Sequence, residues 1–258
     1  MTNAECRMEG EASRVDSPFV IRHSSFDQWL LWQLVDSAFP TGGFAHSAGL
    51  EPAWQHGEVK NRSELISFVE ASLHQLGHAA LPFVIAAHAE PERLEEFDNL
   101  CDAFTTNHVA NRASRAQGKA FSTAVQRIFT VGQVSRLSPS KSSDARQINM
   151  ETGKMPVLRF NHLACVFGAA MRQLDISQEI TARLFFFNHL RSVIAAAVRL
   201  NIVGPMDAQA IQHQLSFTAE DILKRCASLT LDDIAQTSPL LDMWQGAQDR
   251  LYSRLFQS

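Results

Sequence analysis

The segment from Leu31 to Gly57 holds the residues whose types and spacing are best suited to a binding role. The run Phe39-Pro40-Thr41-Gly42-Gly43 predicts a tight turn, because neighbouring glycines after a proline allow a positive φ or a close backbone approach. A turn that opens a helix also leaves free N–H groups pointing at whatever lies above them. The candidate partner-binding residues of this segment are Asp36, Ser37, Gly42, Gly43, His46, Ser47 and Glu51.

Two roles remain open for these side chains. Beside the Gly-Gly turn, His46 is suited to touch a partner, to pass a metal, or only to cap a helix, and the residues favour partner contact and capping equally. Asp36, Ser37 and Glu51 are predicted to form a polar cluster around the turn. Such a cluster either holds the turn in one shape for docking or serves only to satisfy turn and helix-end amides.

A second candidate surface lies between residues 250 and 258. A helix is predicted from about residue 239 to 256, and it would carry its cationic and aromatic side chains as two separate stripes. Tyrosine and arginine are favoured interface anchors, although arginine near a helix C-terminus also simply complements the helix dipole. The candidate partner-binding residues here are Arg250, Tyr252, Arg254, Leu255 and Phe256.

Motifs for catalysis are absent from the sequence. Gly118-Lys119 and Gly153-Lys154 lack the spacing of a phosphate-binding loop, and no Gly-x-Ser-x-Gly elbow occurs. His74 and His78 are one helical turn apart and suit a zinc or nickel ion, but Gln75 stands where a hydrolytic site needs glutamate. We favour the interpretation that these two histidines simply lie on a helix surface and bind no metal ion. The sequence therefore predicts no catalytic residue, no metal-ligating residue and no enzyme.

The composition of the sequence narrows the class of protein and its expected partners further. The 258 residues are 45% hydrophobic and 19% charged, which allows a sizeable core, and the net charge of −4 argues against a nucleic-acid partner. The four cysteines form no C-x-x-C pair, so neither a disulfide framework nor a structural zinc site is expected. No signal peptide or membrane-spanning run is recognised, and we expect a cytoplasmic protein.

Apolar residues recur at helical spacing along most of the chain, as in Leu94, Phe97, Cys101 and Phe104. No alternation typical of strands is found. These patterns predict an all-α, single-domain helical bundle of about nine or ten helices. The predicted helices include residues 44–51, 61–77, 79–87, 158–174, 206–215, 218–228 and 239–256.

Two segments lack this periodicity. Residues 1–24 are predicted to be a flexible N-terminal arm, and residues 131–157, rich in serine, are predicted to be a loop insertion within one domain of residues 25–258. Replacing the insertion with a short linker should be nearly neutral for folding.

The order of motifs carries a resemblance to a known family. The run from Gln33 to Glu51 resembles the signature of the urease accessory protein UreF family. Further blocks agree in order: Ala113-Ser114-x-x-Gln117-Gly118, Val198-Arg199-Leu200 with Gly204, and Ser253-Arg254-Leu255-Phe256-x-Ser258. Pro52 departs from the family pattern.

The resemblance implies a helical homodimer that helps to load nickel into urease. Its implied partners are the accessory scaffold UreD (also called UreH), the GTPase UreG and the urease apoprotein. It implies no tightly bound cofactor and at most a transient passage of Ni²⁺. It also places the turn near the metal path or a partner surface, and implies that residues 250–258 become ordered when the scaffold binds. Two alternatives stay open: a metal-dependent helical enzyme, and a helical adaptor unrelated to nickel.

Overall fold

The structure is a computed structural model that describes residues 25–134 and 158–258. The predicted arm at residues 1–24 and residues 135–157 of the predicted insertion lie outside the described residues, so these assignments stay predictions. Residues 131–134, predicted to begin the loop insertion, continue the preceding helix instead. The chain divides into two units, one ending at Asp36 and one running from Ser37 to Ser258. Each unit is described by itself.

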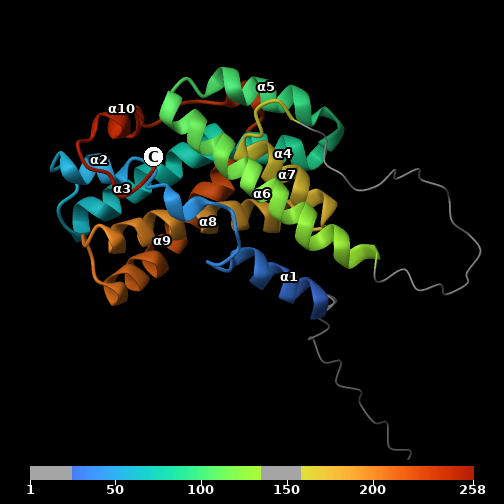
Figure 1. Cartoon of the computed structure of the whole chain (residues 1–258), viewed down its shortest axis with the longest axis horizontal. Coiled ribbons are helices and arrows are strands. Elements are labelled where there is room, and N and C mark those ends of the chain that lie inside the picture. The colour runs from blue at the N-terminus through green and yellow to red at the C-terminus, as the bar shows by residue number, and fades with distance from the viewer. Residues whose placement is uncertain (1–24, 135–157) are drawn as a thin grey trace, which may run out of the picture. The chain divides into compact units, whose positions relative to one another are not determined.

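Every regular element of the described residues is helical, which confirms the predicted all-α fold class (Figure 1). The α-helices are α1 (Ser25–Val35), α2 (Leu50–Gln55), α3 (Arg62–Gln75), α4 (Leu81–Ala89), α5 (Leu94–Phe104), α6 (His108–Val134), α7 (Leu163–Gln173), α8 (Gln178–Arg199), α9 (Pro205–Cys226) and α10 (Pro239–Ala247). A π-helical turn, Leu76–Ala80, joins α3 to α4. Among the described helices, none combines the length and apolarity that crossing a membrane requires.

The first unit contributes one described helix, α1. Trp29 and Trp32 lie three positions apart, so they share one side of this helix. Their rings meet edge to face with centroids 5.1 Å apart, and both side chains are largely exposed.

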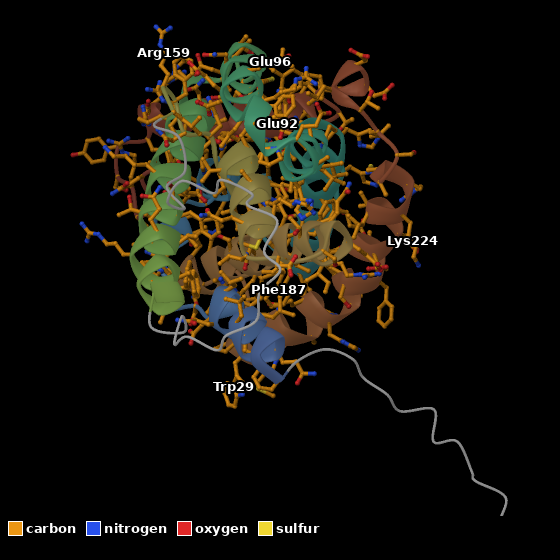
Figure 2. All side chains as sticks on the ribbon, turned by 90° about the vertical axis from the view of Figure 1, so that its right-hand side faces the viewer. Trp29, Glu92, Glu96, Arg159, Phe187 and Lys224 are labelled. Atoms are coloured by element: carbon orange, nitrogen blue, oxygen red, sulfur yellow. The ribbon has the colours of Figure 1, made fainter. Side chains whose placement is uncertain are left out.

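The second unit is built around α4 and α7, which pack together more extensively than any other pair of described helices. Gly168 in α7 permits this approach, because a Cβ at that position would lie 2.2 Å from the carbonyl oxygen of Val84. Next to this pair, α6 packs on α7, and α8 packs on both α4 and α9. Charged side chains such as Glu92, Glu96 and Lys224 project outward (Figure 2).

The sequence signals for helix starts are largely correct. Asn61 caps α3, because its side-chain oxygen accepts the Glu64 N–H at 3.0 Å as the capping pattern predicts. Glu64 in turn accepts the N–H of Lys60, one residue before the expected partner, at 2.7 Å. Ser177 caps α8 through the N–H of Ile180 at 3.4 Å.

Two predicted interruptions are wrong. The helices predicted at residues 206–215 and 218–228 form the single helix α9, because Ile211, Leu215 and Ile222 continue one buried stripe through the predicted gap. The predicted break at Gly77 is a π-helical turn that keeps α3 and α4 continuous. A Cβ on Gly77 would lie 2.9 Å from the Cys226 sulfur, so this glycine serves helix packing.

Two other helix starts differ from the prediction. The helix predicted at residues 158–174 begins only at Leu163, because the Asp98 carboxylate accepts the N–H groups of residues 160–162 at 2.8–3.0 Å and holds them in a loop. The helix predicted at residues 44–51 is a 3-10 turn, Gly43–Ala45, followed by α2. Pro52 lies in the first turn of α2, where its missing N–H disrupts no helix bond.

The fold predicts that Gly118→Ala is strongly destabilising. A Cβ on Gly118 would lie 1.9 Å from the carbonyl oxygen of Asn161, so backbone must move. We expect a loss of about 2–4 kcal/mol in the free energy of unfolding, measured by urea denaturation. Gly246→Ala is the matched control, because its nearest atom is an Asn107 side-chain nitrogen at 3.6 Å and alanine favours a helix. Equal stabilities of the two variants would contradict this packing.

Candidate functional site

The turn predicted at residues 39–43 is present and depends on glycine. Gly42 has φ of 71°, in the left-handed region that favours this residue. The Gly43 N–H donates to Thr41 Oγ1 at 3.4 Å, and the Gly43 carbonyl oxygen accepts Ser192 Oγ at 3.2 Å. Because Ser192 belongs to α8, a long core helix fixes the turn.

The segment after α10 is not the continuous helix that the sequence predicts. Helix α10 ends at Ala247, a 3-10 turn covers Gln248–Arg250, and residues 251–258 (the tail) form no regular element. The two predicted stripes of Arg250 with Arg254 and Tyr252 with Phe256 therefore do not form. The N–H groups of residues 255–257 and the Ser258 carbonyl oxygen bond to residues 45–51 instead of within a helix.

The carboxylate of Glu51 holds the tail in place. Glu51 lies in the first turn of α2 and is 1% exposed. Its Oε1 accepts the Leu255 N–H at 2.6 Å, and its Oε2 accepts the Phe256 N–H at 3.1 Å and the Gln248 amide at 2.7 Å. Three donors around one buried carboxylate make this a strong, charge-assisted clamp. The sequence predicted Glu51 beside Asp36 and Ser37, but its hydrogen-bond partners come from the other end of the chain.

The last residues of the sequence hydrogen-bond directly to residues 45–47, which follow the turn. The Ser47 N–H donates to the Ser258 carbonyl oxygen at 2.5 Å, and the Gln257 N–H donates to the Ala45 carbonyl oxygen at 2.8 Å. His46 Nδ1 shares a short hydrogen bond with Ser258 Oγ. Burial, and after it the charge of Arg112, lowers the pKa of His46 below its usual 6.5. The ring is thus neutral at pH 7 and serves as a hydrogen-bonding group.

Arg199 joins the two segments from α8. Its guanidinium carbon lies 3.8 Å from the ring centroid of Phe44 and 4.2 Å from that of Phe256. It also donates to the Phe44 carbonyl oxygen. The sequence did not predict that Arg199 connects the turn and the tail. Its place in a motif block was the only signal.

An ion cluster fixes the start of the tail from outside. The Asp249 carboxylate accepts hydrogen bonds from three side chains. The N···O distances are 2.8 Å to Arg112, 3.1 Å to Arg254 and 3.2 Å to His108. The hydrogen bond from Arg112 chiefly lowers the pKa of Asp249. Each pair is solvent-exposed, so this cluster contributes less stability than the buried Glu51 clamp.

The side chains of the remaining predicted residues do not take part in this clamp, although the Leu255 backbone N–H does. Tyr252 is 106% exposed, Leu255 is 52% exposed, and Arg250 is exposed. Ser37 lines the cavity described below, and Asp36 ends the first unit. The structure therefore unites Gly42, Gly43, His46, Ser47, Glu51 and Phe256, and leaves Tyr252 and Leu255 as outward-facing side chains.

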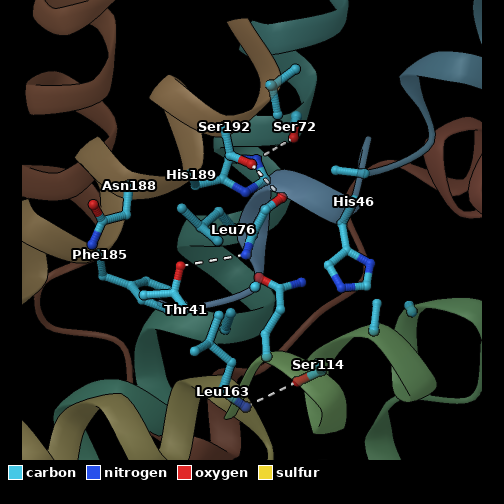
Figure 3. Close-up of a pocket in the computed structure, with 18 of the residues that line it drawn as sticks. Thr41, His46, Ser72, Leu76, Ser114, Leu163, Phe185, Asn188, His189 and Ser192 are labelled. Atoms are coloured by element: carbon cyan, nitrogen blue, oxygen red, sulfur yellow. Dashed lines mark hydrogen bonds between the residues drawn. The ribbon is translucent and has the colours of Figure 1, made fainter. Parts of the chain in front are cut away.

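A cavity of about 530 Å³ lies beneath the turn (Figure 3). Thr41 and His46 line it from the turn, and Asn188, His189 and Ser192 line it from α8. Ser72 Oγ and His189 Nε2 lie 2.6 Å apart in a hydrogen bond. Burial lowers the pKa of His189 to about 4, so this ring too is neutral at pH 7.

The Ser114 motif block has a structural role next to this cavity. Ser114 Oγ accepts a hydrogen bond from the backbone nitrogen of Leu163 at 3.1 Å. The same oxygen lies 3.1 Å from His162 Nδ1. His162 is fully buried, and its Nε2 lies 3.1 Å from Asp102 Oδ1. Together with Asp98, these groups hold the loop before α7 against α5 and α6. The sequence did not predict this network of His162 and the two aspartates.

The two histidines that are one helical turn apart in the sequence lie close together in the structure. The rings of His74 and His78 stack with centroids 6.3 Å apart, and His78 Nδ1 hydrogen-bonds to the His74 carbonyl oxygen at 2.9 Å. Within residues 25–134 and 158–258, no group of three or more histidine, cysteine or acidic residues is arranged to hold a metal ion.

Fold and site together define a class: an all-helical protein with a candidate binding surface formed by the turn and the tail. Comparison with known proteins gives the family. The UreF family model matches residues 59–216. Urease accessory protein F of Oryza sativa is 37% identical over 98% of this chain and 91% of its own length. Urease accessory protein F of Arabidopsis thaliana is 38% identical over 92% of this chain and 95% of its own.

A protein of Schizosaccharomyces pombe described as an uncharacterized urease accessory protein UreF-like is 30% identical over 87% of this chain and 94% of its own length. The chain belongs to the UreF family of urease accessory proteins, as the sequence motifs indicate.

We expect Glu51→Ala to release the tail while the helices stay folded. The substitution leaves the Leu255 and Phe256 N–H groups without their acceptor. Exchange of these amides with deuterium should become at least tenfold faster, and trypsin should cut faster after Arg254. Glu95→Ala, at an exposed position of α5, is the control. Unchanged tail exchange in Glu51→Ala would contradict the clamp.

We expect His189→Gln to weaken the pH dependence of stability. Because the folded-state pKa of His189 lies near 4 and the unfolded value near 6.5, the unfolded chain binds more protons in this window. The stability from the neutral ring is present above pH 6.5 and is lost as the pH falls toward 4, by about 2–3 kcal/mol. Urea denaturation across this range should show a shallower loss in His189→Gln. His213→Gln, at an exposed position, should retain the original slope.

Proposed function

We propose that this protein acts in urease maturation as a nickel-insertion chaperone that bridges the scaffold UreD/UreH and the GTPase UreG and regulates GTP-dependent nickel delivery to the urease apoprotein. The proposal rests on membership of a family of urease accessory proteins and on the surface formed where the tail (residues 251–258) packs on residues 43–51. We also propose that the protein is a cytoplasmic homodimer that holds no resident cofactor. Ni²⁺ would pass through it only as cargo.

The observation that carries the proposal is the Glu51 clamp. In the single chain the tail is already fixed on the turn, which differs from the expectation that it becomes ordered only with the scaffold. A fixed segment lets a partner bind without the entropy cost of ordering it. The clamp buries Phe256 and directs Tyr252 and Leu255 outward, and exposed aromatic and aliphatic side chains on a rigid support are suitable interface anchors.

The mechanism in this proposal is allosteric. Binding of the scaffold and the GTPase to one preformed surface favours a single conformation of the GTPase, so that GTP hydrolysis and nickel release occur together. The conformational preference requires that each partner bind the assembled state more tightly than the free one.

The double variant Tyr252→Ala/Leu255→Ala tests this surface. Both side chains are exposed, so the variant should fold with unchanged thermal stability. In a pull-down with the organism's own UreD/UreH and UreG, with and without GTP and Ni²⁺, we expect at least tenfold weaker capture of the scaffold and reduced urease activation in cells.

The matched control is Met206→Ala/Phe217→Ala, which removes two exposed apolar side chains from α9, away from the tail. Full scaffold capture by the tail variant would reject the tail as the scaffold surface. Failure of the unmodified protein to retain either partner would reject the bridging function itself.

A further inference from the structure

One wall of the cavity under the turn is a continuous series of aromatic rings. Phe39 and Phe121 have ring centroids 6.0 Å apart, Phe121 and Phe167 stack at 5.1 Å, and Phe167 and Phe185 lie 5.4 Å apart. All four line the cavity, and they come from the turn and from three different helices. Such a wall favours a flat apolar group in contact with it.

Another part of the wall presents uncharged polar groups. Asn188 and His189 project from one turn of α8 and Ser192 from the next, and His189 lies beside Ser72 (Figure 3). His189 and Ser72 hydrogen-bond to each other, and Ser192 bonds to the turn. The Oδ1 atom of Asn188 is buried and has no hydrogen-bond partner among the described residues. A buried amide of this kind calls for a partner, because an unsatisfied polar group is costly.

Arg191, Arg199 and Asp242 are the charged side chains that line the cavity, and each contacts another group. The guanidinium carbon of Arg191 lies 5.8 Å from the centroid of the Phe187 ring. The guanidinium of Arg199 lies between the rings of Phe44 and Phe256, and the Asp242 carboxylate accepts the Asn107 amide at 2.9 Å. The neutral state of His189 at pH 7 adds no charge to the polar side. Transfer of an ion into such surroundings is unfavourable without a counter-charge.

From these observations we infer that the cavity is a binding site for a small, planar, uncharged molecule whose aromatic body lies on the Phe39–Phe185 wall and whose amide edge pairs with Asn188. A carboxamide presents a donor and an acceptor side by side, so it complements the Asn188 amide in either of the two orientations of that side chain. The volume of about 530 Å³ is within the range of small-molecule sites.

Benzamide is the probe that tests this site, by saturation-transfer difference NMR and titration on the full chain. We expect saturable binding with a dissociation constant of about 1 mM or tighter. N,N-dimethylbenzamide, which lacks both N–H donors, should bind about tenfold more weakly, and so should benzoate, which carries a charge. No urease partner takes part, so the result is independent of the bridging function.

Asn188→Leu isolates the amide contact. The variant keeps a side chain of similar size and removes a buried atom without a partner, so its melting temperature should be unchanged or higher. It should bind benzamide about tenfold more weakly and no longer distinguish it from the dimethyl analogue.

Ala79→Trp should block the cavity, and Ala89→Trp, on an exposed position outside it, is its control. If Ala79→Trp fails to fold, Asn188→Leu alone decides. Absence of saturable benzamide binding to the folded protein, equal binding by Asn188→Leu, or benzoate binding as tight as benzamide would each overturn the inference.

Discussion

The contact between the turn and the tail depends on the buried carboxylate of Glu51. A carboxylate that is 1% exposed is unfavourable unless its charge is compensated by hydrogen bonds, and here two backbone N–H groups and one amide provide them. The compensation runs in both directions. Without Glu51 the Leu255 and Phe256 amides lose their acceptor, and without the tail the carboxylate keeps only one of its three donors, Gln248. Two segments about 200 residues apart in the sequence therefore hold one another in place.

The helices could be predicted from the sequence because their signals are local. The stripe of Leu94, Phe97 and Cys101 is buried as its spacing predicts, and Asn61 caps α3 with its own side chain. The tail could not be predicted this way. Residues 239–256 have helical spacing of apolar groups, but the conformation after Ala247 is decided by Glu51, which sequence periodicity cannot place beside Leu255. Similarly, α7 starts late because of Asp98, on another helix.

Several residues of the contact between turn and tail were singled out from the sequence, but their arrangement was not predicted. Gly42, His46, Ser47 and Glu51 were recognised as unusual neighbours, and Phe256 was recognised separately. The turn and the tail meet through backbone atoms: Ser47 N–H with the Ser258 carbonyl, and Gln257 N–H with the Ala45 carbonyl. Every residue has these groups, so composition and spacing carry no trace of such pairing.

The tail and the cavity are coupled because they share residues. Phe256 is part of the clamp, packs on Arg199 and lines the cavity, and His46 likewise lines the cavity and bonds to Ser258. Lifting the tail would expose the Phe256 ring, at a cost of about 2–3 kcal/mol, and break the Glu51 bonds as well. To convert a rare state with the tail lifted into the dominant one, a partner must bind that state more tightly than the state with the tail in place. The difference in binding free energy must be about 5.5 kcal/mol or more. The shared residues thus give a surface-binding event a direct physical path to the interior, with Phe256 as the moving part.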